Sequence, residues 1–137
     1  MGITAGNIVI MNKNGLEIER KFLICLPDCK AISLMENTTV MKISQTYLND
    51  DSRIREIEEK GKVYYIKTVK KKISEITRLE KECQISRQEY LSSLKDKRKG
   101  TKSIAKTRYA VNLDGLVFEI DVFPFWNDRA FLEVELQ

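Results

Sequence analysis

The chain contains no histidine, few cysteines and no long run of apolar residues. The absence of histidine excludes the serine and cysteine triads that depend on an imidazole, together with most zinc sites. Because no apolar run is long enough for a membrane-spanning helix, no membrane partner is expected. Residues 1–15 also lack the basic start and the apolar core of a signal peptide.

The three cysteines, Cys25, Cys29 and Cys83, are odd in number and lack the paired spacing of a metal site. Cys25 and Cys83 stand among apolar residues of strand-like segments, which predicts buried, reduced thiols rather than a disulfide. Reduced thiols are typical of a reducing compartment, and the sequence therefore predicts a cytoplasmic protein.

A length of 137 residues suffices for one domain with a substantial core. The net charge of +4 favours an anionic partner, although it does not distinguish nucleic acid from a small phosphate compound. We expect residues 1–15 to form a flexible leader and residues 16–137 to fold as a single domain.

Alternation of apolar and polar residues predicts eight β-strands, separated by turn residues such as those at 49–51, 60–62 and 112–115. Two helices are expected, around residues 29–36 and 87–98, and the second begins with a capping-box spacing from Ser86 to Glu89. The eight predicted strands are residues 16–24, 40–48, 52–59, 62–70, 77–85, 103–111, 116–123 and 130–136.

The polar positions of these strands are charged to an unusual degree. Glu17, Glu19 and Lys21 alternate along the first strand, and residues two apart share one face of a strand. For any single strand, the simplest interpretation is a charged face in solvent. The pattern nevertheless recurs on most of the strands, where like charges would repel one another across a sheet.

A closed barrel resolves this repulsion if the charged faces line a polar lumen and the apolar faces point outward onto the helices. The sequence therefore predicts an α+β, mainly β fold: an eight-stranded antiparallel β-barrel, or tunnel, with helices packed outside. Carboxylates without histidine or cysteine suit Mg²⁺ or Mn²⁺, whereas arginine and lysine suit phosphate oxygens. A metal-bound triphosphate needs both kinds of group.

In order and spacing, the charged motifs resemble those of the CYTH, or triphosphate tunnel metalloenzyme, superfamily. The hallmark E-x-E-x-K of that superfamily corresponds to Glu17-Ile18-Glu19-Arg20-Lys21. The resemblance extends through Arg53-Ile54-Arg55, Lys67, Glu80-Lys81-Glu82, Lys106-Thr107-Arg108, Glu119-Ile120-Asp121 and Glu133-Val134-Glu135. It implies an eight-stranded antiparallel tunnel and, for most members, hydrolysis of tripolyphosphate or an organic triphosphate with Mg²⁺ or Mn²⁺.

The resemblance also implies roles for individual residues. The implied metal ligands are Glu17, Glu19, Glu119, Asp121, Glu133 and Glu135, and the implied phosphate-binding bases are Lys21, Arg53, Arg55, Lys67, Lys106 and Arg108. Catalysis is assigned to Glu17, Glu19, Lys67 and Glu133, with Glu80 and Glu82 as a supporting acidic wall. Members usually continue into a C-terminal helical segment, which we expect this domain to lack because the sequence stops at Gln137.

Three other functions remain open from the sequence. The tunnel residues would also serve a class IV-like adenylyl cyclase that makes cyclic AMP from ATP, which ranks lower because no adenine pocket is identified, or a non-catalytic module that binds polyphosphate. A nucleic-acid-binding barrel is less favoured, because the acids nearly match the bases and the lysines at 70–72 and 95–102 fit solvated loops. The expected partner is therefore a small-molecule triphosphate, and a homodimer is left open.

Overall fold

The computed structural model describes the backbone of residues 4–12, 15–75 and 77–136, and the side chains of residues 20–75 and 77–135. Nine strands occur within these ranges. In chain order they are β1 (Thr4–Asn12), β2 (Gly15–Cys25), β3 (Thr38–Tyr47), β4 (Arg53–Glu59), β5 (Lys62–Lys72), β6 (Thr77–Ile85), β7 (Ile104–Leu113), β8 (Leu116–Val122) and β9 (Arg129–Leu136).

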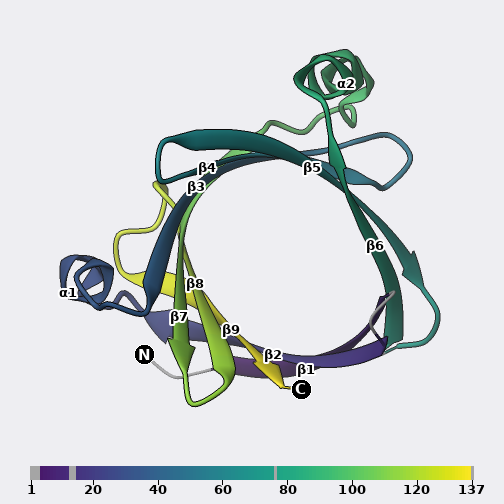
Figure 1. The fold of residues 1–137 in the computed structure, drawn as a ribbon. Coiled ribbons are helices and arrows are strands. Elements are labelled where there is room, and N and C mark those ends of the chain that lie inside the picture. The colour runs from purple at the N-terminus through teal and green to yellow at the C-terminus, as the bar shows by residue number, and fades with distance from the viewer. Residues whose placement is uncertain (1–3, 13–14, 76, 137) are drawn as a thin grey trace.

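The strands form a closed barrel, seen along its axis in Figure 1. Strands β2 to β9, which match the eight predicted strands, make one continuous antiparallel sheet in the order β2-β9-β8-β7-β3-β4-β5-β6. The predicted antiparallel barrel is therefore confirmed. The two edges of this sheet, β2 and β6, do not pair with each other but are joined by β1.

Strand β1 lies in the segment for which the sequence predicted a leader. It pairs antiparallel with β2 along its whole length, and in parallel with β6 through residues 9–11 and 77–79. Strand β1 therefore closes the barrel between β2 and β6, although β6 is distant from it in sequence.

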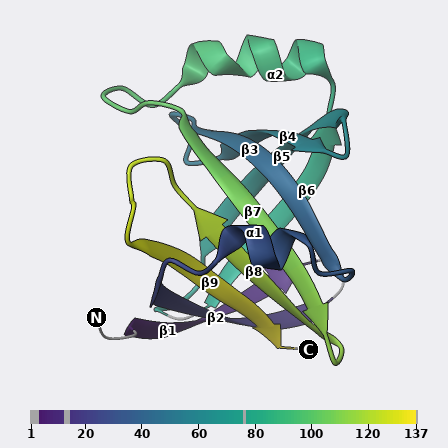
Figure 2. The same cartoon turned by 90° about the vertical axis from the view of Figure 1, so that its left-hand side faces the viewer.

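Two helices lie outside the ring of strands, as the sequence predicted (Figures 1 and 2). Helix α1 (Cys29–Ser33) packs against β3, and helix α2 (Arg87–Ser93) continues into a 3₁₀ turn (Leu94–Asp96). Ser86 caps α2, because its hydroxyl accepts a hydrogen bond of 3.1 Å from the backbone N–H of Glu89. Each helix is short and covers part of the outer, apolar face of the barrel.

The best-packed core lies between α2 and the outer face of the sheet. Tyr90 of α2 meets Tyr65 of β5 with ring centroids 4.8 Å apart, and both rings are buried with Leu48, Ile54 and Ile85. Ile54 is fully buried, whereas its neighbours on β4, Arg53 and Arg55, point to the lumen. Alternation along β4 therefore separates an apolar exterior from a charged interior.

Two minor expectations have different outcomes. Cys25, Cys29 and Cys83 are free thiols, but Cys25 and Cys83 are exposed, so the predicted burial of these two is wrong. Cys83 stands on the outer face of β6, whereas Cys25 lies at the end of β2 on the same face as the inward Lys21. Among the described residues, no helix is both long and apolar enough to cross a lipid bilayer.

Candidate functional site

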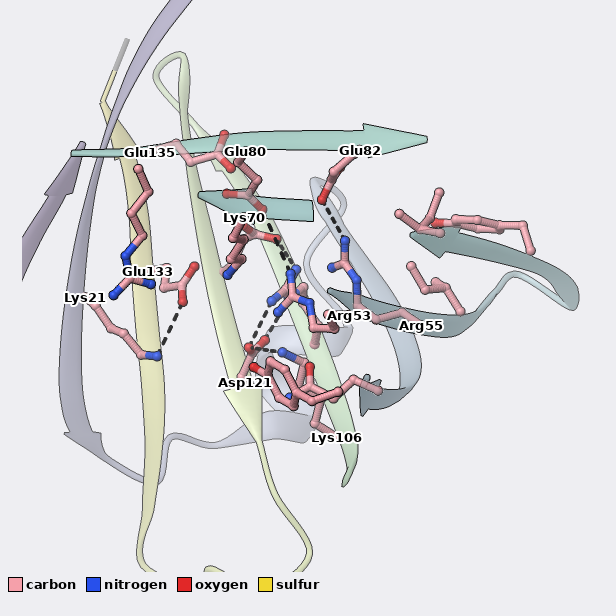
Figure 3. A pocket seen from close by; sticks show the side chains of 18 residues that line it. Lys21, Arg53, Arg55, Lys70, Glu80, Glu82, Lys106, Asp121, Glu133 and Glu135 are labelled. Carbon is pink, nitrogen blue, oxygen red and sulfur yellow. Dashed lines mark hydrogen bonds and ion pairs between the residues drawn. The ribbon is translucent and has the colours of Figure 1, made fainter. Parts of the chain in front are cut away.

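A cavity of about 480 Å³ lies within the ring of strands, and each of the strands β2 to β9 contributes side chains to it (Figure 3). Its charged lining comprises seven bases and six acids. The bases are Lys21, Arg53, Arg55, Lys70, Arg78, Lys106 and Arg108, and the acids are Glu80, Glu82, Glu119, Asp121, Glu133 and Glu135. The lining also includes Gln45, Tyr47, Ile57, Tyr64 and Ile66. Charges of both signs therefore face one another across a confined, polar space.

Asp121 anchors two of the bases. Its Oδ2 accepts hydrogen bonds from Lys106 Nζ at 2.9 Å and Arg108 Nη2 at 3.0 Å, and its Oδ1 accepts one from Arg108 Nε at 2.8 Å. Asp121 and Lys106 are almost fully buried, at 4% and 7% exposure. Burial raises the pKa of Asp121, but these bonds outweigh it and hold the pKa below its ordinary value. Because both oxygens are engaged by bases, the geometry favours an anchoring role for Asp121 over the metal-ligand role implied by its motif.

Burial also lowers the pKa of Lys106, to about 8, although the carboxylate of Asp121 opposes this shift. The positive charges of Arg108 and Arg53 add to the lowering. Lys106 is therefore a cation at neutral pH that loses its proton within a mildly alkaline range.

This titration gives an expected pH dependence of anion binding. As the pH rises from 7 to 9, Lys106 loses its charge, so the affinity for tripolyphosphate should fall by up to about tenfold. Calorimetric titrations at several pH values measure this fall. The Lys106→Arg variant, which stays charged, controls for titration of the anion itself. An identical pH profile in the two proteins would show that Lys106 does not contact the anion.

Arg55 on β4 is held in place by side chains of β5 and β6. Its Nη2 donates to Glu82 Oε1 at 2.6 Å and to Thr68 Oγ1 at 3.2 Å. Burial lowers the pKa of Arg55, and the nearby charge of Arg53 adds to this effect, whereas Glu82 opposes it. Arg55 is thus a buried, oriented cation whose guanidinium borders the cavity.

Three bases at one end of the cavity are less well compensated. Arg53 Nη2 lies 4.0 Å from Glu80 Oε1, at the limit of an ion pair. Within the described side chains, no ion pair of 4.0 Å or less joins Lys70 or Arg78. Burial and the charge of Arg53 lower the pKa of Lys70. This cationic end is therefore ready to accept an anion.

A strip of carboxylates lies along β8 and β9. Glu119 and Glu133 are cross-strand neighbours, and Glu135 follows on β9. Burial raises the pKa of Glu119, and the negative charge of Glu133 raises it further, although Arg108 opposes both effects with a bond of 3.0 Å. Glu133 lies 3.8 Å from Lys21. The strip carries acids close enough to repel one another.

This strip fits a hard divalent cation. Carboxylate oxygens are the ligands that Mg²⁺ prefers, and Mg²⁺ is usually held by one or two carboxylates together with substrate phosphates. The backbone register places Glu19 directly opposite Glu135, and Glu17 two residues further along β2. Within residues 20–75 and 77–135, no three carboxylate or thiol groups form a metal site on their own.

Most of the predicted site residues meet in the cavity. Those that line it are Lys21, Arg53, Arg55, Glu80, Glu82, Lys106, Arg108, Glu119, Asp121, Glu133 and Glu135. The side chains of Glu17 and Glu19 lie outside the described part of the structure, so their predicted roles stay predictions.

Lys67 is the exception, and the expectation that it lines the cavity is wrong. It is paired with Ile54, which lies on the outer face of β4, whereas Ile66 is paired with the inward Arg55. Cross-strand partners share a face, so Lys67 points outward. Lys70, and not Lys67, is the lysine of β5 that lines the cavity.

The family model described as the CYTH domain matches residues 15–137. No curated protein matches the chain significantly.

Solved structures with the same architecture include two from Pyrococcus species. A protein from Pyrococcus horikoshii matches with a TM-score of 0.57 and 22% identity, over 87% of this chain and 77% of its own. A conserved hypothetical protein from Pyrococcus furiosus matches with a TM-score of 0.56 and 22% identity, over 88% and 78%. A candidate adenylate cyclase from Bacillus halodurans matches with a TM-score of 0.53 and 14% identity, over 88% and 80%. At these identities the likeness shows a shared fold.

Proposed function

The chain belongs to the CYTH domain family, and from that premise we propose that it hydrolyses a triphosphate with the help of a divalent metal ion. The family includes triphosphatases and adenylyl cyclase-like proteins, and its members are generally dependent on divalent metals. The observation that supports hydrolysis in this chain is the cavity, in which seven bases and a strip of acids face one another.

The bases would hold the phosphate chain. Arg55 and Arg108 are fixed by Glu82 and Asp121, so their guanidinium groups are oriented before the substrate arrives. Lys106 adds a charge beside Arg108 on β7, while Lys70 and Arg78 extend the cationic surface toward one end. Arginine binds phosphate oxygens in a bidentate manner and lysine binds as a point charge, so the set suits a polyanion.

The acids would hold the metal, which we propose to be Mg²⁺ or Mn²⁺. Glu133 and Glu135 are the ligands favoured here, with Glu119 beside them and with Glu17 and Glu19 as expected ligands from β2. A divalent ion held by these carboxylates would offset phosphate charge and would activate water for attack. The carboxylates also accept hydrogen bonds from the attacking water and so orient it toward the terminal phosphorus.

The reaction would transfer the terminal phosphoryl group to water. The water oxygen forms a bond to phosphorus, the phosphoanhydride bond breaks, and its electron pair leaves with the remaining diphosphate. The water proton passes to a carboxylate of the strip, and the anchored bases offset the charge on the leaving oxygen. The free thiols agree with a reducing compartment, so we propose the cytoplasm as the setting.

An assay of phosphate release tests this proposal. The full chain should release phosphate from tripolyphosphate or from a nucleoside triphosphate when Mg²⁺ or Mn²⁺ is present, and EDTA should abolish the release. With ATP, chromatography of the products distinguishes hydrolysis from cyclisation, because a cyclase would yield cyclic AMP and diphosphate. Binding of tripolyphosphate by folded protein, without turnover under either metal, would instead indicate a polyphosphate-binding module.

A further inference from the structure

The hairpin of β4 and β5 gives the charged cavity one apolar wall. Ile57, Tyr64 and Ile66 line it, and the register pairs Ile57 with Tyr64 and Arg55 with Ile66. Ile57 is 5% exposed, and its neighbour on β3, Ile43, is 3% exposed. Tyr64 and Ile66 are therefore the partly exposed members of this wall, with Ile57 buried beside them and Arg55 next to Ile66.

The lining residues of β4 and β5 change from charged to apolar along the barrel. On β4 the inward residues run from Arg53 through Arg55 to Ile57, and on β5 they run from Tyr64 through Ile66 to Lys70. The strands are antiparallel, so the apolar residues of both lie at the hairpin end and the bases lie at the other end. Figure 3 labels Arg53, Arg55 and Lys70 among the side chains that line the cavity.

An inorganic polyphosphate cannot form favourable contacts with the apolar end of the cavity. Every part of it is charged or strongly polar, whereas the exposed parts of Tyr64 and Ile66 are largely apolar and gain about 25 cal/mol per Å² when an apolar group covers them. Burial raises the pKa of Tyr64, and the charge of Glu59 adds to this rise, so the phenol remains neutral at physiological pH. A neutral, half-buried ring between two isoleucines offers a stacking surface.

We propose that this wall binds the planar base of a nucleoside triphosphate, which makes Tyr64 the residue that distinguishes an organic from an inorganic triphosphate. The proposal rests on the proposed function, because the phosphates would run from Arg55 toward Arg53 and Lys70. A ligand with a planar apolar end and a polyanionic end matches both halves of the lining. The cavity volume of about 480 Å³ lies within the range of roughly 300–1,000 Å³ that is usual for small-molecule sites.

Other aromatic residues are less suited to the base. Phe123, Phe125, Trp126 and Phe131 pack against one another with centroids 5.2–6.0 Å apart, and none of these four is among the described lining residues. Tyr47 does line the cavity, but the guanidinium of Arg98 lies over its ring, 5.7 Å from the centroid. Of the two tyrosines that line the cavity, Tyr64 is the one for which the described side chains place no cation over the ring.

Calorimetric titration of ATP and of tripolyphosphate, in buffer without divalent metal, tests the proposal. Replacing Tyr64 by serine should weaken ATP binding by about 5- to 100-fold, the usual range for one base stacked on an aromatic ring, and should leave tripolyphosphate binding within about twofold. Tyr64→Phe keeps the ring and should bind ATP as the wild type does. Val63→Ser, one residue away on the outer face and 52% exposed in the native protein, is the matched control.

The outcomes separate the two proposals. Equal losses for ATP and tripolyphosphate, or no loss for either, would overturn the role of Tyr64 while leaving a triphosphate site intact. Failure of the wild type to bind either compound would overturn the proposed function together with this inference. Retained binding of tripolyphosphate by Tyr64→Ser shows that the variant is folded.

Discussion

Replacing Asp121 by asparagine is expected to lower the free energy of unfolding by about 3–5 kcal/mol near neutral pH. The side chains of Asp121 and Lys106 are only 6% and 5% exposed, and Arg108 donates two further hydrogen bonds to the same carboxylate. The variant would leave the buried Lys106 without its negative partner and would leave Arg108 with Glu119 alone. Urea denaturation, followed by circular dichroism, measures the loss.

The Asp128→Asn variant is the matched control. Asp128 also forms an ion pair, with Arg129 at 2.9 Å, but on the exposed surface, where such pairs contribute little. Its unfolding midpoint should therefore stay close to that of the wild type. If Asp121→Asn unfolded at the same urea concentration as Asp128→Asn, the buried anchor described here would not exist.

The Glu133→Gln variant is expected to release phosphate from tripolyphosphate at least about 100-fold more slowly than the wild type. Glu133 stands in the carboxylate strip beside Glu119, and glutamine keeps its shape but removes the charge that holds a divalent ion. Because the lost ligand weakens metal binding, a higher Mn²⁺ concentration should recover part of the rate. Steady-state assays over a series of Mn²⁺ concentrations measure both effects.

Glu58→Gln supplies the comparison for this experiment. Glu58 lies on the exposed, outer side of β4, so the same chemical change is made away from the cavity, and turnover should be unaffected. A Glu133→Gln variant with the wild-type rate and the wild-type Mn²⁺ requirement would remove the carboxylate strip from the mechanism.

Much of the fold could be predicted because charge and apolarity alternate so regularly. On β8, Glu119 and Asp121 alternate with Phe118 and Ile120, and only a barrel with a charged interior lets several such strands lie side by side. The predicted strand ranges therefore agree with β2 to β9 within a few residues at each end. The paired acids and bases also identified most of the cavity lining.

Lys67 shows where alternation alone is insufficient. Strand β5 carries a lysine and a tyrosine on each face, with Tyr64 and Lys70 inward and Tyr65 and Lys67 outward, so its own pattern does not choose the inner face. The pairing register with β4 determines which face of β5 is the inner one. A tight hairpin at Lys60-Gly61 pairs Ile54 with Lys67, and this turn was visible in the sequence.

The closing strand and the exposed thiols could not be read from local patterns. Strand β1 completes the barrel by pairing in parallel with β6, which is distant in the chain, and only the three-dimensional arrangement brings these strands together. Cys25 and Cys83 stand in strand-like sequence, but the exposure of Cys83 depends on which parts of the outer face the two short helices cover, and that of Cys25 on its place at the end of β2.

A crystal structure of the protein with tripolyphosphate and Mn²⁺ is the most direct measurement of the central claim, since the anomalous signal of manganese locates the metal. We predict phosphate density inside the barrel, within hydrogen-bond distance of Arg55, Lys106 and Arg108, and manganese bound by Glu133 and Glu135. Tripolyphosphate bound only to lysines on the outer surface, with manganese absent from the interior, would contradict it.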